Sequence, residues 1–164
     1  MFSKKMQDAM NQQIKHEFYS SYLYLGMSAH FESVNLPGFA HWMKAQSDEE
    51  AEHGMKFFDF INERNGRVVL EAIDKPPTEF KSPLEVMKKV LEHEKKVTAM
   101  INALYELAVK EKDYPSQVML QWFITEQVEE EKSASDIIEL LKNLGDTPAG
   151  LIMVDEKLGG RKAD

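Results

Sequence analysis

The sequence FAHWMKAQSDEEAEHGMKFFDFINER, residues 39–64, carries apolar side chains spaced three and four residues apart. That spacing places them on one face of a helix. Near the middle of the stretch the same face carries Gln46, Glu50 and His53. Residues three apart are neighbours on a helix, so Glu50 and His53 offer two metal-ligand groups side by side. The stretch therefore predicts a core helix with polar chemistry at its midpoint.

Three further stretches have the same design. Each has an apolar stripe at helical spacing that is interrupted near its midpoint by at least one carboxylate. The interruptions are Glu17 in the first stretch, Glu94 in the third, and the pair Gln127 and Glu130 in the fourth. The midpoints of packed helices of similar length coincide whether the helices run parallel or antiparallel. We therefore predict an all-α fold, an antiparallel-type four-helix bundle in which these side chains meet in one central layer.

Turn and capping signals set the limits of the predicted helices. Asn65-Gly66 is a stop signal, Ser82-Pro83 begins a capping box, and Thr147-Pro148 starts a short fifth helix. Gly145 is expected to end the fourth helix. The predicted helices, all within a single domain over 1–164, are about 3–33, 38–65, 83–112, 116–144 and 148–158.

The segment 66–82 is predicted to be a long crossover. Val68 to Leu70 is locally strand-like, and Pro76-Pro77 excludes a helix. A helix of ~28 residues is ~42 Å long, whereas ~16 extended residues reach ~53 Å. The segment can thus travel the length of the bundle, which would make the second and third helices parallel.

Composition narrows the possible functions. With 164 residues, 43% of them hydrophobic and 29% charged, the chain suits one globular domain. It has no cysteine, so iron-sulfur clusters, thiolate zinc sites and cysteine nucleophiles are excluded. Residues 1–10 do not form a signal peptide and no stretch suits a membrane span, so we expect a cytoplasmic protein with no membrane partner. A net charge of -8 disfavours nucleic acid as a partner and favours cations.

Four carboxylates in one buried layer require positive charge nearby. Burying an unpaired charge costs several kcal/mol or forces protonation. Two divalent ions would balance Glu17, Glu50, Glu94 and Glu130. The sequence therefore predicts a dinuclear metal site, with His53 and Gln127 in the same layer.

A second acidic group lies beside the first and has two interpretations. Glu49, Glu126, Glu129 and Glu130 could form a third, all-oxygen cation site. The run 129–131 could equally be a charged face in solvent. Tyr24, two turns after Glu17, could act beside the metals or be an ordinary core tyrosine. Trp122 is expected to have a packing role, and His16, His30, His41 and His93 surface or capping roles.

Taken together, these residues resemble those of the non-haem bacterial and archaeal ferritins over essentially the whole chain. The similarity rests on Glu17 with Tyr24, on Gln46 through Glu49-Glu50 to His53, on Glu94, on the run Glu126 to Glu130, and on Asp146 to Leu151. A haem-containing bacterioferritin would show a second Glu-x-x-His where this chain has Gln127-x-x-Glu130. A rubrerythrin would need cysteines, and the DNA-coating mini-ferritins lack the fifth helix.

The resemblance implies an iron-storage protein with ferroxidase activity and no haem. Glu17, Glu50 and His53 would hold one iron, and Glu50 would bridge to a second held by Glu94 and Glu130. Gln127 would be a hydrogen-bonding or weak ligand, and Glu49, Glu126, Glu129 and Glu130 would form the third iron site. It further implies a cage of twenty-four subunits that uses dioxygen or hydrogen peroxide, with the segment 68–70 pairing across a dimer contact and the fifth helix lining a channel.

Two other functions fit the residues. A different di-metal enzyme on the same bundle, such as a small oxidase or a manganese catalase, would need a substrate pocket and would not accumulate iron. A purely structural helical protein would leave its central acids solvated.

Overall fold

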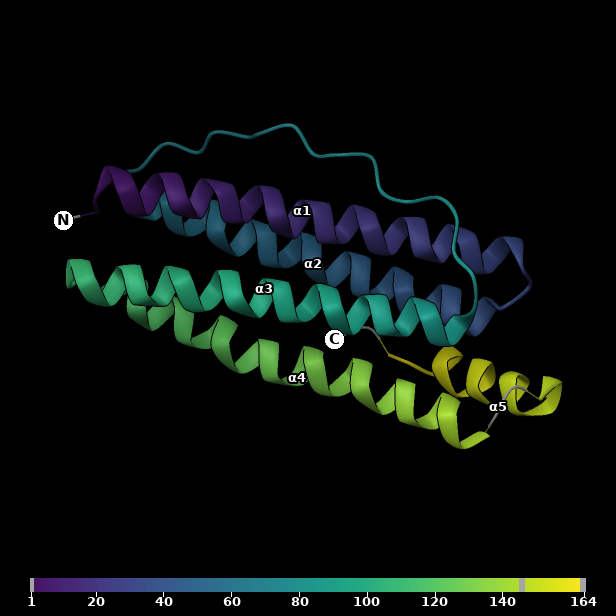
Figure 1. Ribbon diagram of the computed structural model, residues 1–164. Coiled ribbons are helices and arrows are strands. Elements are labelled where there is room, and N and C mark those ends of the chain that lie inside the picture. Colours follow the sequence, from purple (N-terminus) through teal and green to yellow (C-terminus); the bar gives the residue numbers. More distant parts are fainter. Residues whose placement is uncertain (1, 145–146, 163–164) are drawn as a thin grey trace.

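A computed structural model describes residues 2–144 and 147–162 and confirms the predicted all-α bundle (Figure 1). Four long helices, α1 Lys4–Ser33, α2 Pro37–Glu63, α3 Pro83–Glu111 and α4 Tyr114–Leu144, are followed by the short α5 Pro148–Gly159. α1 is antiparallel to α2, and α3 is antiparallel to α4. None of these helices is long and apolar enough to cross a membrane.

The helix ends follow the capping residues and differ from the predicted limits by one or two residues. The Ser3, Ser82 and Thr147 side chains accept hydrogen bonds from the amides three residues later and cap α1, α3 and α5. α4 begins at Tyr114 instead of 116, because the Asp113 carbonyl already accepts the Gln117 amide. The predicted stop at Gly145 falls outside the described residues, as does Asp146.

The segment between α2 and α3 runs the length of the bundle, so α2 and α3 are parallel as predicted (Figure 1). The described chain forms no strand at 68–70, in contrast to the strand-like pattern of those residues. Side chains of α1 bind this backbone instead. Asn11 Nδ2 donates to the Arg67 carbonyl over 3.0 Å, and Asn11 Oδ1 accepts the Val69 amide over 2.9 Å. These bonds satisfy backbone groups that a neighbouring strand would otherwise pair.

The apolar core has two parts. One cluster, near α5, packs around Phe31, Phe39 and Met87, and the other, near the N-terminus of α1, packs around Met10, Phe57 and Phe123. The predicted polar residues lie between them along the helices. The fold thus places the ligand-type side chains between two dry layers.

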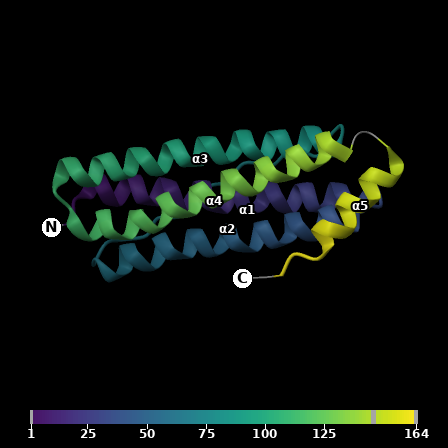
Figure 2. The ribbon, with the colours of Figure 1, turned by 90° about the horizontal axis from the view of Figure 1, so that it is seen from below.

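The short helix α5 packs across the start of α2 (Figure 2). The Asp155 side chain accepts the Phe39 amide over 2.9 Å, which caps α2 where Leu36 offers no side-chain bond. A Cβ on Gly38 would lie 1.7 Å from the Asp155 carbonyl oxygen. Glycine at position 38 is therefore what allows α5 to approach α2.

Candidate metal centre

Six polar side chains that the sequence analysis placed in the core are all buried. The central four carboxylates are 0–7% exposed, although each sits in the middle of a long helix. The helices are held at the same level by the apolar clusters on either side. The buried set is Glu17 from α1, Glu50 and His53 from α2, Glu94 from α3, and Gln127 and Glu130 from α4.

Glu17, Glu50 and His53 form one compact group of potential ligands. One ligand atom from each lies within 4.8 Å of the other two. His53 Nδ1 is 3.3 Å from Glu50 Oε2, and Gln13 Nε2 donates to Glu17 Oε1 over 2.8 Å. The second oxygen of Glu17 and Oε1 of Glu50 are buried without a hydrogen-bond partner among the described residues. A cation bound here would be the partner that both oxygens lack among the described residues.

A second group joins His53 to Glu126 and Glu130, again with ligand atoms within 4.8 Å of one another. Glu130 is fixed by Gln46, whose amide Nε2 donates to Glu130 Oε2 over 2.6 Å. Gln46 lies in the helical stripe of residues 39–64, but its spacing alone indicated no role for it. Its contact with Glu130 orients that carboxylate toward the centre of the bundle.

Glu94 is held by a different set of neighbours. The Tyr24 hydroxyl donates to Glu94 Oε1, and Gln127 Nε2 lies 3.2 Å from Glu94 Oε2. Gln127 also donates to Thr98 Oγ1. Tyr24 and Gln127 are thus hydrogen-bond donors to a candidate ligand. Glu94 belongs to neither three-residue group.

Burial changes the protonation of this layer. Desolvation, partly offset by a hydrogen bond from Gln13, raises the pKa of Glu17 to about 7. Desolvation and then the charge of Glu94 raise the pKa of Glu130 to about 8 and that of Glu50 well above its ordinary value. Without a cation the layer therefore holds protons at neutral pH, and a bound metal ion would displace them.

The imidazole of His53 is prepared to act as a neutral donor. Burial, with a smaller effect of the Lys56 charge, lowers the pKa of His53 to about 4. At neutral pH the ring is uncharged and can offer a lone pair to a metal ion. The His53 and Trp122 rings pack in a T-shaped arrangement at a centroid distance of 5.3 Å. Trp122 has the packing role expected of it but is 41% exposed.

The structure does not bring all of the second acidic group together. Glu126 and Glu130 join His53, whereas Glu129 is exposed and belongs to neither ligand group. Glu49 is ion-paired with Arg161, whose Nη2 lies 2.5 Å from Glu49 Oε2. Helical spacing could not identify Arg161, because this residue lies outside every predicted helix.

His93 was assigned a surface or capping role but is only partly exposed. Its Nε2 lies 2.7 Å from Ser20 Oγ, and its ring meets the Tyr24 ring edge-on at 5.9 Å. His93 therefore packs against the tyrosine that donates to Glu94. In the sequence, the one indication that His93 lies near the candidate metal centre was its position directly before Glu94.

Comparison with known proteins agrees with this geometry. A family model described as a ferritin-like domain matches residues 7–144. A bacterial non-heme ferritin of Bacteroides fragilis (strain 638R) is 45% identical over 161 residues, which cover 98% of this chain and 100% of the relative. The corresponding protein of Staphylococcus haemolyticus is 38% identical over 164 residues, which cover 100% of this chain and 99% of the relative.

A solved structure is similarly close. The crystal structure of an open pore ferritin from the hyperthermophilic archaeon Archaeoglobus fulgidus has a TM-score of 0.98 and 48% identity, covering 99% of this chain and 100% of that chain. The family model, the relatives and the shared fold confirm the resemblance found in the sequence. With its carboxylate layer buried between two apolar clusters, the chain belongs to the non-haem ferritins of bacteria and archaea.

Proposed function

We propose that this chain stores iron and oxidises Fe(II) at the buried layer between its helices. The proposal rests on two carboxylate oxygens, one each on Glu17 and Glu50, that have no hydrogen-bond partner in the described part of the chain and lie beside the neutral imidazole of His53. Such oxygens are tolerated in a dry core only with protons or cations. Carboxylates with one imidazole form a donor set that suits iron.

Glu17, Glu50 and His53 would bind one Fe(II), and Glu50 with Glu94 and Glu130 a second. When both are bound, two Fe(II) supply two electrons to dioxygen, which takes up two protons to give hydrogen peroxide and two Fe(III). Hydrogen peroxide as oxidant would instead give two water molecules. The chain's own part is to hold both ions close together, to keep Glu94 and Glu130 oriented through Tyr24 and Gln46, and to release protons as the ions bind.

The proposed storage of iron requires an assembly of subunits that encloses a cavity. We propose a hollow cage, with twenty-four copies as the expected number, in which Fe(III) collects as mineral. The similarity to the Archaeoglobus fulgidus ferritin supports this architecture. A third ion would bind near Glu126 and Glu130, toward Glu49 and Glu129. No haem is needed for the reaction.

The test is Glu50→Ala, which removes the proposed bridge between the two ions. Removing a hydrogen-bond partner of a metal ligand typically lowers metal affinity or activity about 10- to 100-fold, so loss of a shared ligand itself should slow the fast phase of Fe(II) oxidation by more than about 100-fold. Stopped-flow absorbance measures the rate, and circular dichroism checks that the helices remain. Glu52→Ala, on the exposed face of the same helix, is the matched control and should oxidise iron normally. Oxidation at the normal rate in Glu50→Ala would contradict the assignment.

Storage is tested separately from oxidation. Native mass and iron content are measured after aerobic loading with Fe(II). A very large particle that holds far more than three ions per chain supports storage. A monomer or dimer that keeps two or three ions would instead favour a small di-metal oxidase on the same bundle.

A further inference from the structure

The chain that follows α5 turns back onto α2 and places a cation beside the candidate metal centre (Figure 2). The Arg161 amide donates to the Leu158 carbonyl as α5 ends. The Arg161 carbonyl oxygen lies 2.8 Å from His41 Nε2 at the start of α2. These contacts fix the backbone at Arg161, so its side chain is delivered to one place.

The guanidinium of Arg161 is bound at several points. Nη1 donates to Gln46 Oε1 over 2.9 Å and to the Trp42 carbonyl over 3.3 Å. Nη2 donates to Glu49 Oε2 over 2.5 Å, and the group lies over the Trp42 ring at 4.7 Å. The side chains of Arg161 and Glu49 are only 20% and 21% exposed. Exposed ion pairs contribute little, but a forked, partly buried and stacked arginine is held in one geometry.

The side-chain amide of Gln46 connects Arg161 to the candidate ligand Glu130. Because Gln46 Oε1 accepts from Arg161, the amide NH₂ group of Gln46 must face the other way, where it donates to Glu130 Oε2. Arg161 is therefore two hydrogen bonds from Glu130. It also sits directly on Glu49, whose other oxygen, Oε1, is buried without a partner among the described residues.

We infer that Arg161 is a tethered counter-cation for Glu49, and that a metal ion must displace it in order to bind that carboxylate. The inference rests on the proposed function, because the ion concerned is the third one described above. A guanidinium on one oxygen of Glu49 repels a divalent cation at the other. Filling this position would thus release the Arg161 guanidinium from Glu49 and from the Trp42 ring, while the backbone contacts of Arg161 remain. The other two ion positions do not require this release, because none of their ligands touches Arg161.

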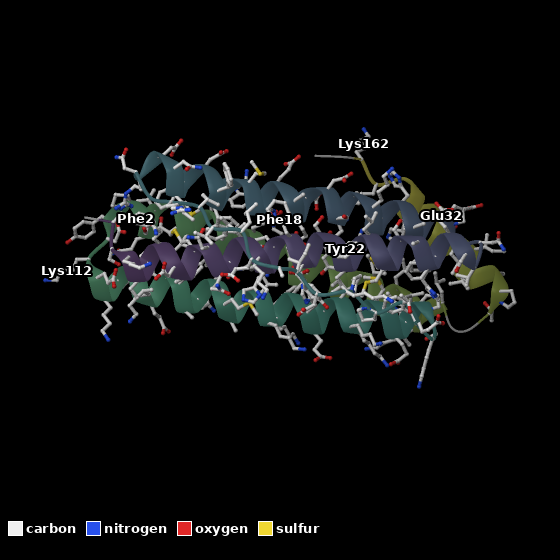
Figure 3. The ribbon with its side chains drawn as sticks, turned by 90° about the horizontal axis from the view of Figure 1, so that it is seen from above. Phe2, Phe18, Tyr22, Glu32, Lys112 and Lys162 are labelled. Atoms are coloured by element: carbon white, nitrogen blue, oxygen red, sulfur yellow. The ribbon has the colours of Figure 1, made fainter. Side chains whose placement is uncertain are left out.

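Zinc binding to the metal-free, assembled protein tests the competition without any oxidation. Isothermal titration with Zn²⁺ alone should give tight binding at Glu17, Glu50 and His53, followed by a weaker event. In Arg161→Gln the weaker event should tighten about tenfold, equivalent to about 1.4 kcal/mol. Lys162→Gln is the matched control. It removes the same charge from the next residue, which projects away from the bundle (Figure 3), and should change the affinity less than twofold. Glu49→Gln should weaken the event in either background.

Fluorescence of Trp42 tests displacement directly. The chain has two tryptophans, so in a Trp122→Phe background the emission reports Trp42 alone. Zinc at the weaker position should shift that emission as Arg161 leaves the ring, and the shift should vanish when Arg161→Gln or Glu49→Gln is added.

The zinc experiments distinguish failure of the competition at Glu49 from failure of the proposed iron centre. A weaker event that is unchanged or weakened in Arg161→Gln, or Trp42 emission that does not respond to zinc, would overturn the competition. Absence of the tight event would instead count against the proposed iron centre. In Arg161→Lys the charge remains but the fork is lost, so tightening should be smaller than in Arg161→Gln. Tightening as large as in Arg161→Gln would mean that charge is irrelevant and would also overturn the inference.

Discussion

The buried carboxylate layer should make the metal-free protein lose stability as the pH rises from 7 to 8. A carboxyl group whose pKa is raised by folding stabilises the folded state at low pH, where it is protonated. That contribution is lost as the pH climbs from the unfolded pKa toward the folded one. Glu130, with a pKa of about 8, is still largely protonated in the folded protein at pH 7, and the pKa of Glu50 is also raised well above its ordinary value. Glu17, at about 7, has lost most of its contribution by then.

The magnitude follows from linkage. A group that is protonated only in the folded state lowers the free energy of unfolding by about 1.4 kcal/mol per pH unit. Glu130 is half deprotonated by pH 8, so it removes about 1 kcal/mol between pH 7 and 8, and Glu50 adds at most about 1.4 kcal/mol. For a chain of this size these losses correspond to a fall in Tm of roughly 2–10 °C. His53 and His93, whose pKa values are lowered to about 4 by burial, act in the opposite direction. Their effect is largely complete by pH 7, since an unfolded histidine titrates near 6.5.

The assay is thermal unfolding followed by circular dichroism, with metal removed by chelation, at pH 7.0, 7.5 and 8.0. Glu50→Gln should reduce the fall in Tm, because one of the two titrating groups is gone. Saturating Zn²⁺ should flatten the profile, since bound carboxylates carry no proton at any of these pH values. A Tm that stays constant or rises across this range in the metal-free protein would refute the claim that these carboxylates are buried together without compensating charge.

Other substitutions test single contacts. Tyr24→Phe removes the donor to Glu94 and should destabilise the metal-free protein by about 1.5–3 kcal/mol in denaturant unfolding, whereas Tyr22→Phe, at an exposed position, should not. Gly38→Ala places a Cβ against the Asp155 carbonyl, so α5 should leave α2; hydrogen exchange across 148–159 should accelerate while exchange in α3 stays slow. Phe57→Ala opens a cavity where Phe57 stacks on Phe123 and should cost about 3–5 kcal/mol, and an unchanged Tm would contradict the description of that cluster.

Much of the fold could be predicted because helical spacing determines which face is buried. The stripe positions that interrupt the apolar pattern, such as Glu17, Glu94 and Gln127, are all buried in the structure. The parallel course of α2 and α3 followed from the reach of an extended chain alone. Whether these side chains bind iron stays a prediction.

The edges of the site could not be predicted in the same way. Spacing along α2 and α4 grouped Glu49 with Glu129, but it carries no information about residue 161, which reaches Glu49 only through the packing of α5 at Gly38. The roles of Gln46 and His93 likewise depend on which partner faces them across the bundle. Such contacts come from tertiary packing, and no periodicity within a single helix contains them.

The core is divided into two apolar clusters, with the buried polar layer between them. Parting the helices at either end would separate close-packed methionine and phenylalanine side chains. In the polar layer between the clusters, parting them lets water reach carboxyl oxygens that have no hydrogen-bond partner among the described residues. If the layer binds metal as proposed, a local opening here would admit a hydrated ion, and the bound ion would link α1, α2 and α4, which carry the grouped ligand atoms.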